Sequence, residues 1–399
     1  MKILWLAPIF PYPPYSGGQT RSFNLIKNLA RNHQITLLAF WRPNRLQGPI
    51  KAMAKYCQPI KTFPGRPIWS VRNLSLAAFS GLPLTITHFY GDRSVTSALQ
   101  KELVSQKYDL AHFESFYTSP YLTENLGVPT VLGNENVEYR VYQRFGRQKK
   151  FPLSLILQLE VAKMKRFEQA AWCRADLNLA VSGVDAQAVR QVTGKKCWVI
   201  PNGVDLSHFQ RFKSRKRRQN DPFILLFVGD FKYFTNQDAI RLLVEKVWPK
   251  VASRCPEATL RLVGRHPNDW IKGLASKKII VDTGVDDIRQ AYGSADVLLA
   301  PMRIASGTNL KILEAMAAGL PVVTTSVGIE GIRAKTGRDA LVADDPDQLA
   351  YQVISLLKNV AQRQQLSAAG QKIVKQHYDW PQITKTLEKA YEGLINYHS

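Results

Sequence analysis

The sequence has few cysteines, and their spacing suggests neither a metal site nor a disulfide framework. Cys57, Cys173, Cys197 and Cys255 stand far apart, and no two of them form a Cys-x-x-Cys pair. Such spacing argues against a structural zinc site and against the disulfide-rich class of small secreted domains. We therefore expect a protein of the reducing cytoplasm.

Long apolar runs are also missing. A membrane-spanning helix needs about 20 consecutive apolar residues, whereas the longest candidates here, such as residues 223–228, have the length of a strand. The apolar start, residues 1–10, runs directly into Pro11, Pro13 and Pro14 and lacks a small-residue cleavage site. It therefore predicts a first buried strand and not a signal peptide, and we expect no membrane-spanning segment.

Acidic residues are scarce relative to basic ones. The 31 Asp and Glu residues oppose 54 Lys and Arg residues, which gives a formal net charge of +23. A positive field of this kind attracts nucleotides, phospholipid head groups, nucleic acid and diphospho-lipids, and charge alone does not choose among them. No Gly-x-Gly-x-x-Gly follows the first predicted strand, which argues against a dehydrogenase.

The composition, 45% hydrophobic and 21% charged, is that of a globular protein long enough for two domains. Strand-like runs alternate with amphipathic stretches, the pattern of parallel sheets with crossover helices. One series comprises residues 2–7, 35–40, 110–113, 130–132, 177–181 and 198–201, and the next comprises residues 223–228, 259–263, 279–283, 297–301, 322–324 and 340–343. The predicted fold class is α/β, with two doubly wound parallel-sheet domains facing a central cleft.

The predicted boundaries follow from the same pattern. Residues 1–204 form the first domain, residues 205–221 a linker, residues 222–379 the second domain and residues 380–399 a C-terminal helix. We expect this helix to pack back on the first domain through its apolar stripe. The linker lacks apolar periodicity and carries a basic run: Lys213, Arg215, Lys216, Arg217 and Arg218.

The strongest local signal is residues 300–323, A-P-M-R-I-A-S-G-T-N-L-K-I-L-E-A-M-A-A-G-L-P-V-V. A strand is predicted to end at Pro301, and a loop then leads into a helix that begins near Thr308. The N-terminus of a helix offers free backbone N–H groups and the positive end of the helix dipole. The groups that could cradle an anion here are those of Gly307, Thr308, Asn309 and Leu310.

Lys311 and Glu314 lie three residues apart on this helix, and hence on roughly the same face. The lysine would add a full charge to a phosphate site, and the glutamate could accept both hydroxyl protons of a ribose. An ordinary exposed ion pair has the same spacing. The pair on its own fits both interpretations.

This segment, G-T-x-L-K-x-L-E-A-M-A-A-G-x-P-V-V, resembles the donor-binding segment of glycosyltransferase family 4. The resemblance extends over nearly the whole chain. It includes A-P-I-F-P-Y-P-P-Y-S-G-G-Q-T-R from Ala7, A-V-S-G-V-D from Ala180, I-P-N-G-V-D-L-S-H-F from Ile200 and L-L-F-V-G-D-F from Leu225. It implies a GT-B fold of two Rossmann-like domains and the transfer of a sugar from a nucleoside diphosphate to a hydroxyl group, with retention of configuration.

The resemblance also implies further donor contacts. Gly17 and Gly18 would let the backbone approach the donor's phosphates, and Val285 would contact the base through its backbone. A plain turn remains the alternative at both places. Where many members carry an Arg after the glycine of the strand and a Lys further on, this chain has Asp230 and then Thr235-Asn236. The positive charge for the diphosphate is therefore assigned to Lys311 and Arg303.

Two further departures concern catalysis. Ser306 stands eight positions before Glu314, where the family carries a glutamate, and a hydroxyl offers no negative charge to a developing oxocarbenium centre. Glu135 stands where a histidine commonly touches the donor sugar, so it is predicted to orient a sugar hydroxyl or to activate the acceptor. A loop carboxylate without such a role is the alternative.

His112 is the remaining catalytic candidate, at the end of the strand in D-L-A-H-F-E-S, where it or Glu114 could face the cleft. A buried histidine with satisfied hydrogen bonds is an equal alternative. The acidic pairs Asp286-Asp287 and Asp344-Asp345 stand beside predicted helix starts, where Asp caps the helix. We therefore expect no metal, and no cofactor besides the sugar nucleotide that serves as donor substrate.

The expected partners are a nucleoside-diphosphate sugar and a glycan, lipid-linked or small-molecule acceptor. A basic group near one predicted helix consists of Lys149, Lys150, Lys163, Lys165 and Arg166. It is either a solvated face or a contact with anionic lipid at the inner face of the membrane. We expect the apolar residues of that helix to form core or cleft wall: Leu153, Ile156, Leu157, Leu159 and Val161.

The alternative function is a non-catalytic basic module that binds nucleic acid or an anionic polymer on the same scaffold. Only the net charge supports it, because the sequence has no recognition-helix pattern and no aromatic-interleaved basic motif. No specific nucleic-acid partner is therefore expected.

Overall fold

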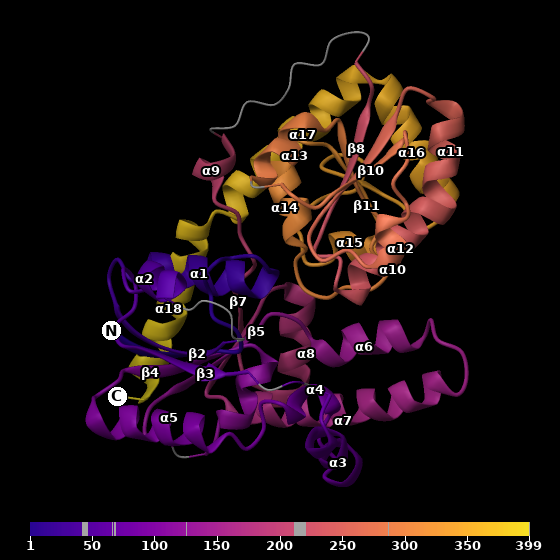
Figure 1. Cartoon of the computed structure of the whole chain (residues 1–399). Coiled ribbons are helices and arrows are strands. Elements are labelled where there is room, and N and C mark those ends of the chain that lie inside the picture. Colours follow the sequence, from indigo (N-terminus) through magenta and orange to yellow (C-terminus); the bar gives the residue numbers. More distant parts are fainter. Residues whose placement is uncertain are drawn as a thin grey trace. The chain divides into compact units, whose positions relative to one another are not determined.

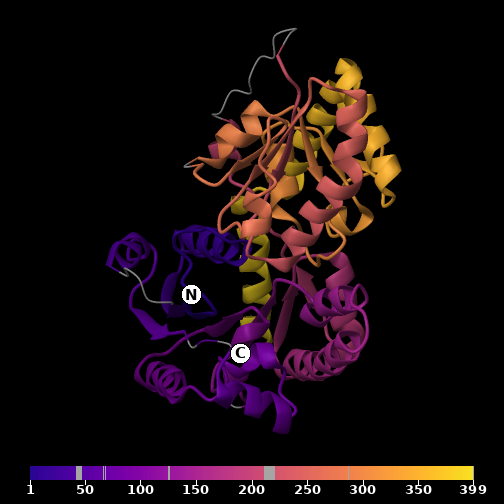
Figure 2. The same cartoon turned by 45° about the vertical axis from the view of Figure 1, so that its right-hand side comes forward.

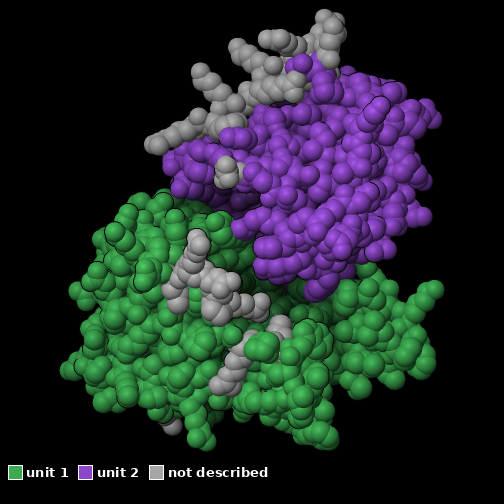
Figure 3. All heavy atoms as spheres, in the orientation of Figure 1, with its two compact units in different colours: residues 1–201, 380–399 green, residues 202–379 purple. Residues whose placement is uncertain are grey.

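The computed structural model describes residues 1–41, 47–65, 67, 69–124, 126–210, 221–285 and 287–398. The chain divides into two compact units, and Figure 3 distinguishes them by colour. Unit 1 comprises Met1–Pro201 and Trp380–Ser399, and unit 2 comprises Asn202–Asp379. The basic run from Lys213 to Arg218, and Asp286 of the first acidic pair, lie outside the described residues.

Unit 1 is built on a parallel seven-stranded sheet in the order β3-β2-β1-β4-β5-β6-β7 (Figure 1). Its strands are β1 (Lys2–Ala7), β2 (Gln34–Trp41), β3 (Ile60–Pro64), β4 (Leu110–Glu114), β5 (Thr130–Asn134), β6 (Leu177–Ala180) and β7 (Cys197–Val199). The central strand β1 is almost entirely apolar because helices cover both faces of such a sheet. In its register, Ile3 pairs with Ile35 on one side and with Leu110 on the other.

The helices of unit 1 connect and cover these strands. They are α1 (Gly17–Leu29), α2 (Gln47–Met53), α3 (Val71–Phe79), α4 (Leu84–Thr87), α5 (Arg93–Ser105), the 3-10 helix η1 (Phe116–Tyr121), α6 (Glu138–Gly146), α7 (Leu153–Arg174), α8 (Gly183–Thr193) and α18 (Trp380–His398). The short strand β3 is absent from the predicted series. Its sequence, I-K-T-F-P, is short, partly polar and ends in proline, which is typical of an edge strand.

Unit 2 repeats the design with a parallel six-stranded sheet in the order β10-β9-β8-β11-β12-β13. Its strands are β8 (Ile224–Val228), β9 (Thr259–Val263), β10 (Ile279–Asp282), β11 (Val297–Ala300), β12 (Val322–Thr324) and β13 (Leu341–Val342). Its helices are α9 (Leu206–Gln210), α10 (Phe234–Leu242), the π-helix η2 (Leu243–Val247), α11 (Trp248–Arg254), α12 (Asp269–Lys272), α13 (Ile288–Ser294), α14 (Leu310–Ala317), α15 (Ser326–Ile329), α16 (Pro346–Lys358) and α17 (Val360–His377). The predicted α/β class with two parallel-sheet domains is confirmed.

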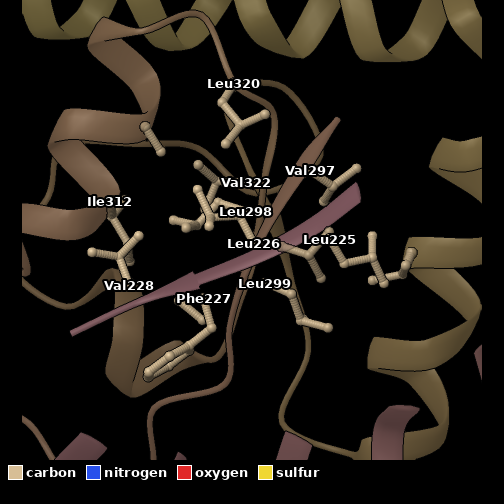
Figure 4. Close-up of a cluster of buried hydrophobic side chains, with 14 of the residues drawn as sticks. Leu225, Leu226, Phe227, Val228, Val297, Leu298, Leu299, Ile312, Leu320 and Val322 are labelled. Atoms are coloured by element: carbon tan, nitrogen blue, oxygen red, sulfur yellow. The ribbon is translucent and has the colours of Figure 1, made fainter. Parts of the chain in front are cut away.

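The core of unit 2 forms where helices close over the central strands. Leu225 and Phe227 of β8 and Leu298 of β11 are fully buried, and Ile312 of α14 belongs to the same cluster (Figure 4). The apolar side of α14 is thus anchored in the core. This anchoring fixes the helix on which the predicted donor residues lie.

The last helix, α18, belongs to unit 1, although it follows unit 2 in the chain. Figure 1 and Figure 2 both show it beside the sheet of that unit. Leu387 and Tyr391 are fully buried and share a cluster with Leu25 and Ile26 of α1. Asn202 and Val204 belong to unit 2, because Asn202 binds Thr308 and Val204 pairs with Asp379.

One helix departs from the expectation for its apolar residues. In α7, Leu153, Ile156 and Leu159 are exposed, and only Leu157 and Val161 are half-buried. The expectation of a core position is therefore wrong for Leu153, Ile156 and Leu159, because the first half of α7 covers the rest of unit 1 with one side only. Within the described residues, no helix combines the length and apolar character needed to cross a bilayer.

Replacing Leu387 tests how strongly α18 holds unit 1. Leu387→Ala should lower the free energy of unfolding by about 2–5 kcal/mol, because it removes a fully buried side chain and leaves a cavity. Tyr397→Ala on the same helix, at a side chain that is 85% exposed, should change it by less than about 0.5 kcal/mol. Denaturant unfolding measures both, and equal losses would show that α18 is not anchored through Leu387.

Candidate functional site

The loop before α14 is held in a fixed shape. Gly307 has a φ of 72°, in the left-handed region that favours glycine. The Asn202 backbone N–H donates to Thr308 Oγ1 at 3.2 Å, and its side-chain amide donates to the Thr308 carbonyl at 3.1 Å. Asn309, the N-cap residue, donates from its side chain to the Gly328 carbonyl at 2.8 Å. These hydrogen bonds fix the loop that leads into α14. The first backbone N–H groups of this helix, starting at Leu310, have no acceptor within the helix.

Lys311 lies half-buried on the first turn of α14. Its Nζ donates to Asn236 Oδ1 at 2.6 Å and lies 4.5 Å from the centre of the Phe227 ring. Burial lowers the pKa of Lys311 to about 7, although the nearby Glu314 carboxylate favours the charged form. An anion bound beside this amine would favour its charged form.

Glu314 lies half-buried one turn further along the helix. Tyr292, a residue of α13, donates from its hydroxyl to Glu314 Oε2 at 2.8 Å. Burial raises the pKa of Glu314 to about 7, against the effects of this hydrogen bond and of Lys311. Lys311 and Glu314 are therefore more than an exposed surface pair, because each is partly removed from water and held by a residue of another helix.

The helix α10 holds both predicted diphosphate cations. Its Asn236 accepts from Lys311, and its Asp238 receives two hydrogen bonds from Arg303, at 3.0 Å from Nε and 2.6 Å from a terminal nitrogen. Asn236 stands in the stretch where the resemblance to glycosyltransferase family 4 implies a lysine. Arg303 is 41% exposed and is directed to Asp238, and Asp230 pairs with His266 and Lys232.

Two further candidates of unit 2 lie in loops. Ser306 is half-buried in the loop immediately before Gly307. Val285 follows the end of β10, is half-buried and packs its side chain against the core of unit 2. The structure thus brings the segment from Gly307 to Glu314 into one compact element and leaves Arg303 engaged with α10.

In unit 1, Glu135 and Gly18 come together. A β-carbon placed on Gly18 would lie 2.8 Å from Glu135 Oε2 and 2.9 Å from Oε1. The missing side chain at this position therefore makes room for the carboxyl group beside the first turn of α1, which begins at Gly17. Within the described part of the chain, no group forms a hydrogen bond to the half-buried Glu135 carboxyl.

Close to Glu135 lies a fully buried network around Glu114. Arg21 Nε donates to Glu114 Oε1 at 2.8 Å, and His112 Nε2 lies 2.6 Å from Glu114 Oε2. The hydroxyl of Tyr391, from α18, lies 2.6 Å from His112 Nδ1, and the Trp5 ring stacks on the imidazole at 3.8 Å. The network joins α1, two central strands and α18.

His112 has no exposed surface, so it does not reach a ligand at the surface of unit 1. Burial lowers the pKa of His112, although Glu114 opposes this shift. The structure places the imidazole as a buried, hydrogen-bonded group that orients Glu114. This is the second of the two alternatives that the sequence allowed.

The two carboxyl groups of this region titrate differently. Burial opposes the ionisation of Glu114, but Arg21 and the hydrogen bond from His112 hold its pKa below the ordinary value. Burial raises the pKa of Glu135 to about 8, and repulsion from Glu114 adds to the shift, against the pull of Arg21. Near neutral pH, Glu114 is therefore ionised and Glu135 protonated.

Several residues of these sites were not predicted from the sequence. Arg21 belongs to the G-G-Q-T-R stretch and could have been noticed as a charged residue within a helix that must bury one face. Tyr391 lies 279 residues from His112, and no local pattern links the two. Asn236, Asp238 and Tyr292 lack a distinctive motif. Among the described residues, no group of three or more His, Cys, Asp or Glu side chains is arranged to hold a metal ion.

The raised pKa of Glu135 predicts a pH-dependent stability. Between about pH 4.5 and pH 8, the folded protein holds a proton on Glu135 that the unfolded chain releases, so stability falls as the pH rises through this window. Glu135→Gln removes this loss and should gain about 1–2 kcal/mol over the parent protein from about pH 5 to about pH 8. Urea unfolding at several pH values measures the difference. The matched variant at the exposed Glu124, Glu124→Gln, should show no such gain, and a constant difference for Glu135→Gln would contradict the assignment.

Models of known protein families match most of the chain. Residues 15–208 match the family model described as Glycosyltransferase Family 4, and residues 222–359 match the model described as Glycosyl transferases group 1. A curated relative, the phosphatidyl-myo-inositol mannosyltransferase of Mycobacterium tuberculosis, is 29% identical over 230 residues. The match covers 54% of this chain and 59% of that protein, so the chain spans little more than half the length of this relative.

Solved structures show the same fold over the whole chain. HepE of Anabaena, crystallised in complex with UDP, has a TM-score of 0.66 at 17% identity and covers 98% of this chain and 100% of its own. Sucrose-phosphate synthase from Thermosynechococcus elongatus has a TM-score of 0.69 at 18% identity and covers 99% and 100%. The fold is GT-B, as the sequence predicts. With family models matched in both units and this fold over its full length, the chain belongs to glycosyltransferase family 4.

Proposed function

We propose that the protein transfers a sugar from a nucleoside-diphosphate sugar to a hydroxyl group of an acceptor, with retention of configuration. The observation that carries this proposal is the pairing of Lys311 with Glu314 on the first two turns of α14, each half-buried and held by another helix. Family membership supports the type of reaction, and the complex of HepE with UDP supports a nucleoside diphosphate as ligand.

The donor's diphosphate would lie at the N-terminus of α14. The backbone N–H groups from Gly307 to Leu310 and the positive end of the helix dipole favour an anion there. Lys311, oriented by Asn236, adds a charge that the bound diphosphate itself stabilises. Glu314, fixed by Tyr292, would accept hydrogen bonds from the ribose hydroxyls.

During transfer, the bond between the sugar's anomeric carbon and the diphosphate oxygen breaks, and a bond to the acceptor oxygen forms on the same face. The leaving diphosphate gains negative charge, which Lys311, Arg303 and the α14 amides stabilise. We propose that these groups act without a metal ion and that the departing phosphate helps to take the acceptor's proton. Arg303 would exchange Asp238 for the diphosphate.

Glu135 would act on the sugar as a neutral acid. A carboxyl group that is protonated near neutral pH can donate a hydrogen bond to a sugar oxygen, which an ionised carboxylate cannot do. Ser306 would offer a hydroxyl in place of the family's glutamate. Gly17 and Gly18 would let the backbone at the start of α1 approach the donor's phosphates, and Val285 would contact the base.

The acceptor is proposed to be lipid-linked, with a soluble glycan as the alternative. The mycobacterial relative is named for a phosphatidyl-myo-inositol acceptor. The basic residues around α7 supply a complementary surface for anionic head groups at the inner face of a membrane.

Thermal unfolding with added nucleotides tests the donor site. A ligand that binds only the folded state must raise the melting temperature, so a saturating matching nucleoside diphosphate should raise it by several degrees, or ~2–3 kcal/mol at about 100 times Kd. Lys311→Ala and Glu314→Ala should each abolish most of this rise. Lys272→Ala, in the exposed i,i+3 pair with Asp269 on α12, is the matched control and should retain it. If no nucleotide raises the melting temperature and anionic polymers do, the binding-module alternative replaces the transferase.

The affinity for the nucleoside diphosphate should depend on pH. Above about pH 7, Lys311 of the free protein is neutral and must take up a proton to bind; below about pH 7, Glu314 is protonated and must lose one. The affinity should therefore be greatest near pH 7 and fall by up to about tenfold per pH unit on either side. Calorimetric titration from about pH 5.5 to about pH 8.5 measures this profile. A flat profile would mean that neither group contacts the ligand.

A further inference from the structure

The first half of α7 is apolar on two opposite faces. The inner face packs toward the rest of unit 1 and consists of Leu157, Val161 and Met164. The outer face carries Leu155, Ile156 and Leu159, which are 51%, 56% and 60% exposed. The inner face is partly or fully buried against its own unit, whereas the outer face is exposed to water. Several exposed apolar side chains close together indicate a surface that contacts another molecule or lipid.

The exposed side chains continue beyond the helix. Phe151, just before α7, is 80% exposed. Within the helix, Leu155 and Leu159 stand four residues apart, a spacing that places their side chains on one side. We call Phe151, Leu155, Ile156 and Leu159 the apolar face. The helix α3 adjoins α7, since Lys163 Nζ donates to the Ala77 carbonyl at 2.7 Å. It adds its own exposed apolar side chains, Val71, Leu74 and Phe79.

Basic residues surround the apolar face, and acidic residues are scarce near it in the sequence. Arg147, Lys149 and Lys150 precede it, and Lys165 and Arg166 follow it along α7; all five are exposed. The sequence contains no Asp or Glu between Glu138 and Glu160, and none before Asp92. Glu160 itself accepts hydrogen bonds from Lys163 and from the Leu84 backbone N–H.

We propose that the apolar face docks on the surface of an anionic lipid bilayer. Its four side chains would enter the boundary between head groups and acyl chains, and the basic residues at both ends would contact lipid phosphates. A second copy of this chain fits less well, because it would bring like charges together around the same apolar residues. The proposal rests on the lipid-linked acceptor of the proposed function, but the docking itself requires no catalysis.

Flotation with lipid vesicles tests the docking directly. The full-length protein should bind vesicles of phosphatidylcholine with about 30% phosphatidylglycerol, and only weakly vesicles of phosphatidylcholine alone. Leu155→Ser combined with Leu159→Ser should weaken binding by about tenfold or more, because two apolar side chains no longer leave water on docking. Tyr351→Ser combined with Val360→Ser, two exposed apolar residues of unit 2, is the matched control and should bind like the parent protein.

Two results would overturn the proposal. One is equal binding by the Leu155/Leu159 variant and the parent. The other is a parent protein that binds neither vesicle type and sediments as a dimer, while the Leu155/Leu159 variant sediments as a monomer. The apolar face would then be an interface between two copies of the chain. The melting-temperature rise with nucleoside diphosphate should be unchanged in the variant. Loss of vesicle binding with an intact nucleotide response therefore concerns the docking surface, and loss of the nucleotide response in the parent concerns the proposed transferase.

Discussion

A charge removed from water must be paired, and the buried Arg21–Glu114 ion pair shows how this requirement organises unit 1. Both side chains are fully buried, and the guanidinium also donates to the carbonyls of Ile200 and Pro201, at the end of the first segment of unit 1. Removing one partner of such a pair leaves an uncompensated buried charge and typically costs ~3–5 kcal/mol. His112 and Tyr391 extend the pair to α18. The helix α1, the strand β4 and the two segments of unit 1 thus meet at one carboxylate.

The pairing in unit 1 also explains why Glu135 differs from Glu114. With Arg21 and His112 committed to Glu114, the second carboxyl group nearby has no cation of its own and keeps its proton up to about pH 8. In unit 2, the charged groups of the candidate site have neutral hydrogen-bond partners instead. Lys311 and Glu314 are held by the neutral partners Asn236 and Tyr292, and both have a pKa of about 7. Such incompletely paired groups respond to a ligand that carries the complementary charge, whereas the fully paired Glu114 network keeps the scaffold rigid.

The features of the fold and of the site that depend on local sequence patterns could be predicted from the sequence. The alternation of apolar runs and amphipathic stretches was enough for the α/β class, and the strand, loop and helix around Gly307 were located to within about two residues. The edge strand β3 was missed because a short, partly polar segment ending in proline carries little apolar signal. The network around Glu114 depends on a tyrosine hundreds of residues away, and no local pattern encodes such a contact. The outward-facing residues of α7 were misassigned because apolar periodicity shows that side chains share a face but not what that face contacts.

We propose that α14 is the element that holds the donor's diphosphate. Hydrogen exchange of backbone amides, measured with and without a saturating nucleoside diphosphate, tests this most directly, because a bound phosphate protects the amides to which it is hydrogen-bonded. We expect slower exchange from Gly307 to Glu314, and unchanged exchange in the first turn of α8, a helix of unit 1 that is already capped by Ser182. Tight nucleotide binding that leaves the amides of α14 exchanging as before would contradict it.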